Sequence, residues 1–114
     1  MPMPARLLLA LVLAAGAGST AQAQRAGDIA FGRTLANENC SRCHAVGTTG
    51  RSAQKGAPPF RLLYKRYDVD ALQEAFVEGI AVGHRGVDMP EFQFTPERTD
   101  ALITYIKSLR PKRK

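Results

Sequence analysis

Cys40-Ser41-Arg42-Cys43-His44 is the most informative stretch in this sequence of 114 residues. The C-x-x-C-H pattern is typical of covalent haem attachment. Two thiols three positions apart can each form a thioether with one of the two vinyl groups on neighbouring pyrroles of a haem. The imidazole of the next residue can then turn to the iron from the same side. The pattern therefore predicts one haem c, held by these side chains.

Three other interpretations of the cysteines remain open. A thioredoxin-like redox pair follows a strand in a βαβ unit, whereas a helical pattern precedes Cys40. A structural zinc site needs four ligands. Cys40, Cys43, His44 and His84 would supply four, but Cys43 and His44 are adjacent, which is not the spacing of zinc fingers. A disulfide between the two cysteines would close a very small ring and add little stability. Haem attachment is the favoured interpretation.

The N-terminus has the three-part layout of a secretory signal peptide. A short basic start precedes the apolar segment 7–17, which is shorter than the roughly 20 residues that cross a membrane. Ala21 and Ala23 are small residues at the −3 and −1 positions of a cut after Ala23. We therefore expect a signal peptide over 1–23 and a mature domain over 24–114.

Length and composition exclude a multidomain enzyme and a multi-span transporter. The hydrophobic fraction is 45%, the charged fraction is 23% and the formal net charge is +6. A domain this small is marginally stable by itself and usually needs a disulfide, a metal or a cofactor. The only two cysteines are neighbours in sequence and cannot join distant segments. A non-protein component of the core is therefore expected.

The periodicity of apolar residues predicts an all-α fold with three main helices. We expect helices over 28–39, over 68–78 and from Thr95 to a point before Pro111. Gly79 is the expected stop of the second helix. Thr95 and Pro96 are suited to the N-cap and the first position of the third helix. No segment has a convincing strand pattern.

The first helix is expected to bury one face, and two long loops should connect the helices. Its apolar face combines small and aliphatic residues, namely Ile29, Gly32, Leu35 and Ala36. Asp28 stands where a carboxylate would complement the N-terminus of this helix. Segment 45–67 holds three glycines, two prolines and several basic residues, and segment 80–94 holds His84, Met89 and Pro90; both are expected to be loops.

Over residues 27–110 the chain resembles the class I monohaem cytochromes c. The C-x-x-C-H motif is joined, in the family's order, by Gly32, Ala57-Pro58-Pro59-Phe60, Met89-Pro90-Glu91-Phe92 and Leu102-Ile103-Thr104-Tyr105-Ile106-Lys107. The resemblance implies a small cytochrome c fold, in which three main helices surround one covalently attached haem. It also implies that Gly32 and Tyr105 lie where the first and last helices approach closely.

The resemblance assigns the cofactor site to Cys40, Cys43, His44, Pro58 and Met89. It makes His44 and Met89 the two iron ligands and makes the Pro58 carbonyl the hydrogen-bond acceptor of His44. Met89 is also the only methionine outside the expected signal peptide. His84 is the rival sixth ligand. Two occupied axial positions leave no place for a substrate, so the expected protein is an electron carrier and not an enzyme.

The expected location is the periplasm, because c-type haem attachment in bacteria takes place outside the cytoplasm. The expected partners are a redox donor and a redox acceptor. Acidic faces on these partners would be attracted by basic residues of this protein. The candidate basic residues flank the part of the 45–67 loop that would wrap the haem: Arg51, Lys55, Arg61, Lys65 and Arg66. Neither nucleic-acid binding nor stable membrane insertion is expected. The alternatives are a haem subunit permanently bound to a dehydrogenase and a zinc-binding module.

Overall fold

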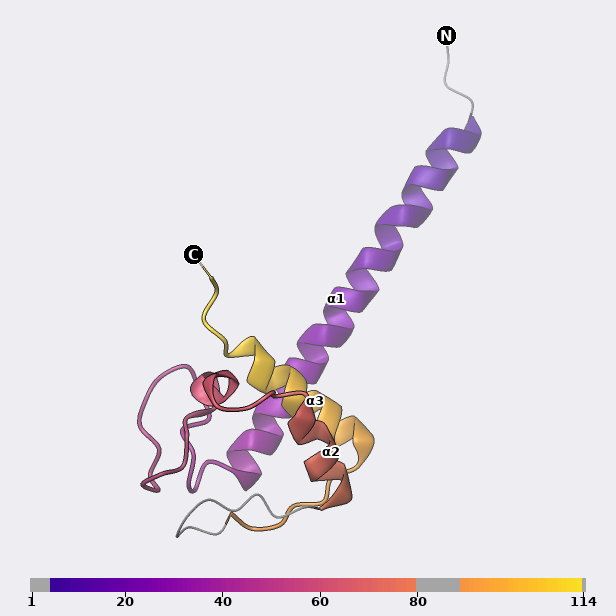
Figure 1. Cartoon of the computed structure of the whole chain (residues 1–114). Coiled ribbons are helices and arrows are strands. Elements are labelled where there is room, and N and C mark those ends of the chain that lie inside the picture. The colour runs from indigo at the N-terminus through magenta and orange to yellow at the C-terminus, as the bar shows by residue number, and fades with distance from the viewer. Residues whose placement is uncertain (1–4, 80–88, 114) are drawn as a thin grey trace.

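The computed structural model describes the backbone of residues 5–79 and 89–113 and the side chains of 18–79 and 89–113. Its elements are α1 (Ala5–Asn39), the 3₁₀ helix η1 (Phe60–Lys65), α2 (Ala71–Glu78) and α3 (Pro96–Ser108) (Figure 1). The described residues contain no strand, which confirms the all-α prediction.

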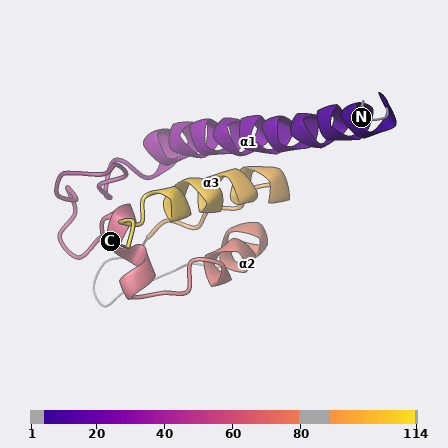
Figure 2. The same ribbon diagram turned by 90° about the horizontal axis from the view of Figure 1, so that it is seen from above.

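Helix α3 is the central element and contacts α1, α2 and η1 (Figures 1 and 2). Most of its buried side chains are apolar, among them Leu102, Ile103 and Ile106. Helices α1 and α3 pack against each other, and Gly32 is buried in their contact. A Cβ atom at Gly32 would lie 2.6 Å from the Tyr105 Cβ and would also collide with the Ala101 carbonyl. The predicted approach of the first and last helices at Gly32 and Tyr105 is confirmed.

The start of the first helix was predicted wrongly. The apolar face is as expected, since Leu35 and Ala36 are buried and Ile29 packs against the core. However, α1 begins at Ala5 and not at Asp28. Residues 22–26 are mostly good helix formers with no proline, so nothing interrupts the helix there. Asp28 lies inside α1 and accepts a hydrogen bond from the Gln24 side chain (3.1 Å) in place of complementing a helix end.

The loop predicted over 45–67 is interrupted by η1. The Leu62 N–H donates to the Pro59 carbonyl and the Arg66 N–H to the Leu63 carbonyl, both at 2.9 Å. Side chains at i and i+3 eclipse in a 3₁₀ helix, so Phe60 and Leu63 share one face, and both are buried. An element of six residues is too short to show a periodic pattern in the sequence.

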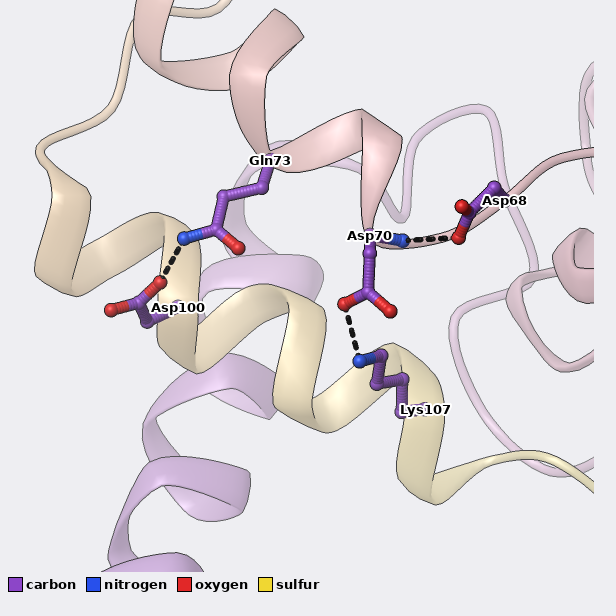
Figure 3. Close-up of polar contacts among 5 residues, drawn as sticks. All are labelled: Asp68, Asp70, Gln73, Asp100 and Lys107. Carbon is purple, nitrogen blue, oxygen red and sulfur yellow. Dashed lines mark hydrogen bonds and ion pairs between the residues drawn. The ribbon is translucent and has the colours of Figure 1, made fainter.

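Helix α2 starts three residues later than predicted. Asp68 accepts a hydrogen bond from the Asp70 N–H (3.1 Å), which forms a turn before the helix. Two polar contacts join α2 to α3: the Lys107 ammonium pairs with Asp70, and the Gln73 amide donates to Asp100 (Figure 3). Both members of the ion pair are exposed, so the pair contributes little to stability.

The ends of α3 are as predicted. Thr95 is the N-cap, its hydroxyl accepts from the Arg98 N–H (3.4 Å), and Pro96 is the first helical residue. The hydrogen bonds of the Glu97 carboxylate with its own backbone and with the Thr95 side chain lower the pKa of Glu97. Residues 89–94 form neither helix nor strand, as expected, while the rest of the predicted 80–94 loop lies outside the described residues.

Candidate functional site

A cavity of about 390 Å³ lies where α1 ends, beside η1, α2 and α3. Its volume is within the range of small-molecule and cofactor sites. The wall is mainly apolar and includes Phe60, Leu63, Leu72, Phe76, Phe92 and Ile106. All five predicted site residues also line the cavity: Cys40, Cys43, His44, Pro58 and Met89. The fold thus brings residues from three separate segments of the sequence to one cavity.

The two cysteines lie in a turn that continues α1. The Cys40 N–H donates to the Ala36 carbonyl (2.9 Å), and the Cys43 and His44 N–H groups both donate to the Cys40 carbonyl (3.2 and 2.9 Å). Cys40 is buried, Cys43 is half-buried, and both are free thiols. The backbone therefore presents the two sulfur atoms and the imidazole to the cavity from one turn.

The His44 ring is held from the side by Pro58 and Phe60. Its Nδ1 lies 2.7 Å from the Pro58 carbonyl oxygen. Because a carbonyl oxygen can only accept, Nδ1 carries the proton and Nε2 keeps its lone pair. The Phe60 ring packs against the imidazole at 5.2 Å between centroids. The contact that the resemblance implies is present, and it leaves His44 with one nitrogen able to bind a metal.

The chain between His44 and Pro58 is tied back by hydrogen bonds. The Phe60 N–H donates to the Ala45 carbonyl (2.9 Å) and the Gln54 N–H donates to the Cys43 carbonyl (3.1 Å). The Ala45 N–H donates to the Ser52 hydroxyl (3.0 Å). These contacts fix the Pro58 carbonyl beside His44, which explains why a long connection without regular structure is ordered.

Met89 is half-buried and lines the same cavity as His44. It packs against the hydrophobic core together with Phe92 and Phe94. Its thioether is thereby available to a cofactor bound in the cavity. The rival ligand, His84, lies outside the described residues.

Burial at the end of α1 affects the Cys40 thiol. Desolvation, with a smaller contribution from Cys43, raises the pKa of Cys40 to about 11. Reactive redox cysteines have lowered pKa values and are accessible, so Cys40 does not resemble one. Among the described residues no group of three or more His, Cys, Asp and Glu side chains is placed to hold a metal.

Sequence reasoning missed part of the cavity wall. Leu63 had no signal because η1 itself was not predicted. Tyr67 follows η1 and lies in no periodic segment, so nothing in the sequence marked it. Leu72 and Phe76 stand four positions apart within the predicted helix 68–78, and this helical spacing of apolar residues is the signal that could have placed them at the site.

The residues fit a covalently bound haem. Two thiols adjoin an apolar cavity, a histidine with a free ring nitrogen lines it, and a methionine lines it from another segment. Histidine and methionine together are a known axial pair for haem iron in electron-transfer proteins. Bound haem supplies one-electron chemistry, in which the iron alternates between the ferrous and ferric states.

The described residues include no helix that is both long enough and apolar enough to span a membrane. No curated protein and no solved structure was found to match the chain. The sequence does match the family described as Cytochrome c, over residues 29–110. This match covers most of the chain and includes the C-x-x-C-H turn, the cavity wall and α3. The protein belongs to the cytochrome c family, and it carries covalently attached haem c and transfers electrons between redox partners.

Proposed function

We propose that this protein is a periplasmic carrier of single electrons and not an enzyme. The supporting observation is the cavity shared by the cysteine pair, His44 and Met89. In this proposal Cys40 and Cys43 would form the two thioethers, and His44 and Met89 would supply the two iron ligands. The Pro58 carbonyl holds His44 by the hydrogen bond of 2.7 Å.

Electron transfer is favoured over catalysis by the use of both axial positions. A haem enzyme that binds its substrate at the iron needs a vacant position, and Met89 would occupy it. His/Met ligation also raises the reduction potential of the iron. The protein's contribution is to hold the two ligands in an apolar wall, so that little has to move when the charge of the iron changes.

Export is supported by where the packing of α1 begins. Residues 18–27 are all exposed, and Asp28 and Ile29 are the first partly buried residues described. A cut after Ala23 would therefore remove none of the described packing. This agrees with a signal peptide over 1–23 and a mature domain over 24–114.

A freely diffusing carrier is favoured over a permanently bound dehydrogenase subunit. The exposed residues of the cavity wall are mainly polar or small: Glu38, Arg42, Gln54, Gly56 and Pro90. A permanent subunit interface would be expected to show a contiguous apolar patch. Electron-transfer encounters are small and transient, and the rims of protein interfaces are polar.

The ligand assignment is tested by two variants of the haem-loaded protein. Met89→Ala should abolish the methionine-to-iron charge-transfer band of the ferric protein, because it removes the thioether. His84→Ala, the matched control, should keep this band and a low-spin spectrum. Absorption spectroscopy measures both. Absence of the band from the unmodified protein, together with loss of the low-spin spectrum in His84→Ala but not in Met89→Ala, would reverse the assignment.

A further inference from the structure

The segment that carries Met89 is fastened to the C-terminal end of α2. The last carbonyl groups of an α-helix lack partners within the helix. Here the Phe94 N–H donates to the Phe76 carbonyl (2.9 Å), and the Gln93 side chain reaches the Val77 carbonyl (3.5 Å). The chain that follows Met89 thus supplies hydrogen-bond partners to two of the last carbonyl groups of α2.

A glycine allows this close contact. Gly79 ends α2 with φ 75°, in the left-handed region, and its N–H donates to the Ala75 carbonyl. A Cβ atom at this position would lie 2.8 Å from the Glu91 carboxylate and 3.6 Å from the Gln93 Cβ. Residues 91–93 therefore cross directly over the end of the helix.

Three aromatic rings extend the contact from α2 towards Met89. The Phe94 ring lies 5.9 Å from the Phe76 ring at 54°, and it stacks on the Phe92 ring at 5.7 Å and 7°. Phe76 and Phe92 line the cavity, whereas Phe94 does not. Such ring pairs stabilise a fold by more than the burial of their apolar area alone. Pro90, next to Met89, further restricts the backbone.

We infer that Phe94 is a positioning residue for Met89: it fixes the Met89 segment to α2 and so determines how readily another ligand can replace the methionine at the iron. The inference rests on the proposed function, in which Met89 binds the iron. An exogenous ligand binds only in the fraction of molecules whose methionine has left, so its apparent affinity reports that fraction.

The test measures imidazole binding to the ferric, haem-loaded protein by absorption spectroscopy. Phe94→Ala removes both ring contacts and should tighten imidazole binding by about tenfold or more, a factor that corresponds to about 1.4 kcal/mol. Phe94→Tyr keeps the ring and should restore the affinity of the unmodified protein. Phe94→Leu should give an intermediate affinity, and it serves if the alanine variant does not fold.

Leu35→Ala is the matched control, because Leu35 is 1% exposed and lies on α1, outside the cavity wall. It should lower the melting temperature without tightening imidazole binding. Equal tightening in Leu35→Ala, or none in the Phe94 variants while the unmodified protein keeps its methionine band, would overturn the positioning role alone. Absence of that band in the unmodified protein would instead refute Met89 ligation, and the positioning role with it.

Discussion

One hydrogen bond at the residue scale determines which nitrogen of His44 is available to iron. The Pro58 carbonyl accepts from Nδ1 and therefore selects the tautomer with a free Nε2. Because the acceptor is a backbone group, its position depends on the fold of the connection and not on the proline side chain. The bonds from Ala45 and Gln54 described above hold that connection in place, so the ligand's orientation depends on residues that never touch the iron.

Thr99 of α3 carries a buried polar group. Its side chain is completely buried, and its hydroxyl has no hydrogen-bond partner among the described residues. Burial of an unpaired hydroxyl costs about 1–3 kcal/mol. Thr99→Val keeps the branched shape and should raise the free energy of unfolding of the haem-loaded protein by about 1 kcal/mol, measured by denaturant titration.

Thr34→Val is the control for this prediction. Thr34 is an exposed threonine of α1 whose hydroxyl donates to the Ala30 carbonyl (3.2 Å). Its replacement should change the free energy of unfolding by no more than about 0.5 kcal/mol, as is usual at the surface. A clear loss of stability in Thr99→Val would show that the hydroxyl has a partner after all.

At the scale of elements, the contact between α1 and α3 depends on the absence of a side chain at residue 32. Gly32→Ala would place a methyl group 2.6 Å from the Tyr105 Cβ and against the Ala101 backbone. Neither atom can move without separating the helices. Overpacking of this kind costs about 1–3 kcal/mol or more, so thermal unfolding of the haem-loaded protein should show a lowered melting temperature.

Gly27→Ala provides a control of opposite sign in the same helix. Gly27 is exposed, and a Cβ atom there would meet nothing within 4 Å. Alanine is favoured over glycine inside a helix by up to about 1 kcal/mol, so this variant should be slightly more stable. Equal effects of the two substitutions would contradict the close approach at Gly32.

Element boundaries could be predicted where single residues mark them chemically. Thr95 and Pro96 mark the start of α3, because the first caps the helix and the second has a fixed φ. Gly79 marks the end of α2, because it adopts a left-handed conformation. Each of these features depends on a single residue. The start of α1 carries no such mark. The 3₁₀ helix around Leu63 was missed because its pattern is set by tertiary packing. The apolar wall of the cavity is distributed over distant segments. The sequence could therefore predict the C-x-x-C-H attachment motif but not which other residues complete the wall.

At the scale of the whole molecule, the cavity is lined in part by residues of the hydrophobic core itself. Side chains of η1, α2, α3 and 89–92 all face it, among them Leu63, Phe76 and Ile106. Without haem these apolar groups lose their common contact. Protein produced without haem attachment should therefore show no cooperative unfolding transition by circular dichroism, although part of the helix signal should remain where α1 and α3 pack directly. A native-like, cooperative transition in haem-free protein would contradict this.

The exposed cations of the 45–67 connection suggest how partners are attracted. Arg51, Lys55, Lys65 and Arg66 are exposed, whereas Arg61 is half-buried and one of its terminal nitrogens is fully enclosed. Arg61 is therefore less available to a partner than the other four. The Arg110 guanidinium lies 5.4 Å from the centroid of the Tyr64 ring, which places the basic C-terminal segment beside η1.

If these cations steer an acidic partner, reversing two of them should slow association. Lys55→Glu with Lys65→Glu should reduce the rate of electron exchange with the natural partner by about tenfold at low salt, because steering raises association rates by about 10- to 1,000-fold. The difference should shrink near physiological ionic strength, where screening acts beyond about 8 Å. Arg25→Glu with Arg98→Glu makes the same change of net charge at exposed positions outside the 45–67 connection, and it should have a smaller effect. Stopped-flow kinetics over a salt series measures both variants, with unchanged haem spectra as the check on folding. Rates that ignore salt and both charge reversals would favour an apolar, permanent contact with a dehydrogenase, because such a contact needs no long-range attraction.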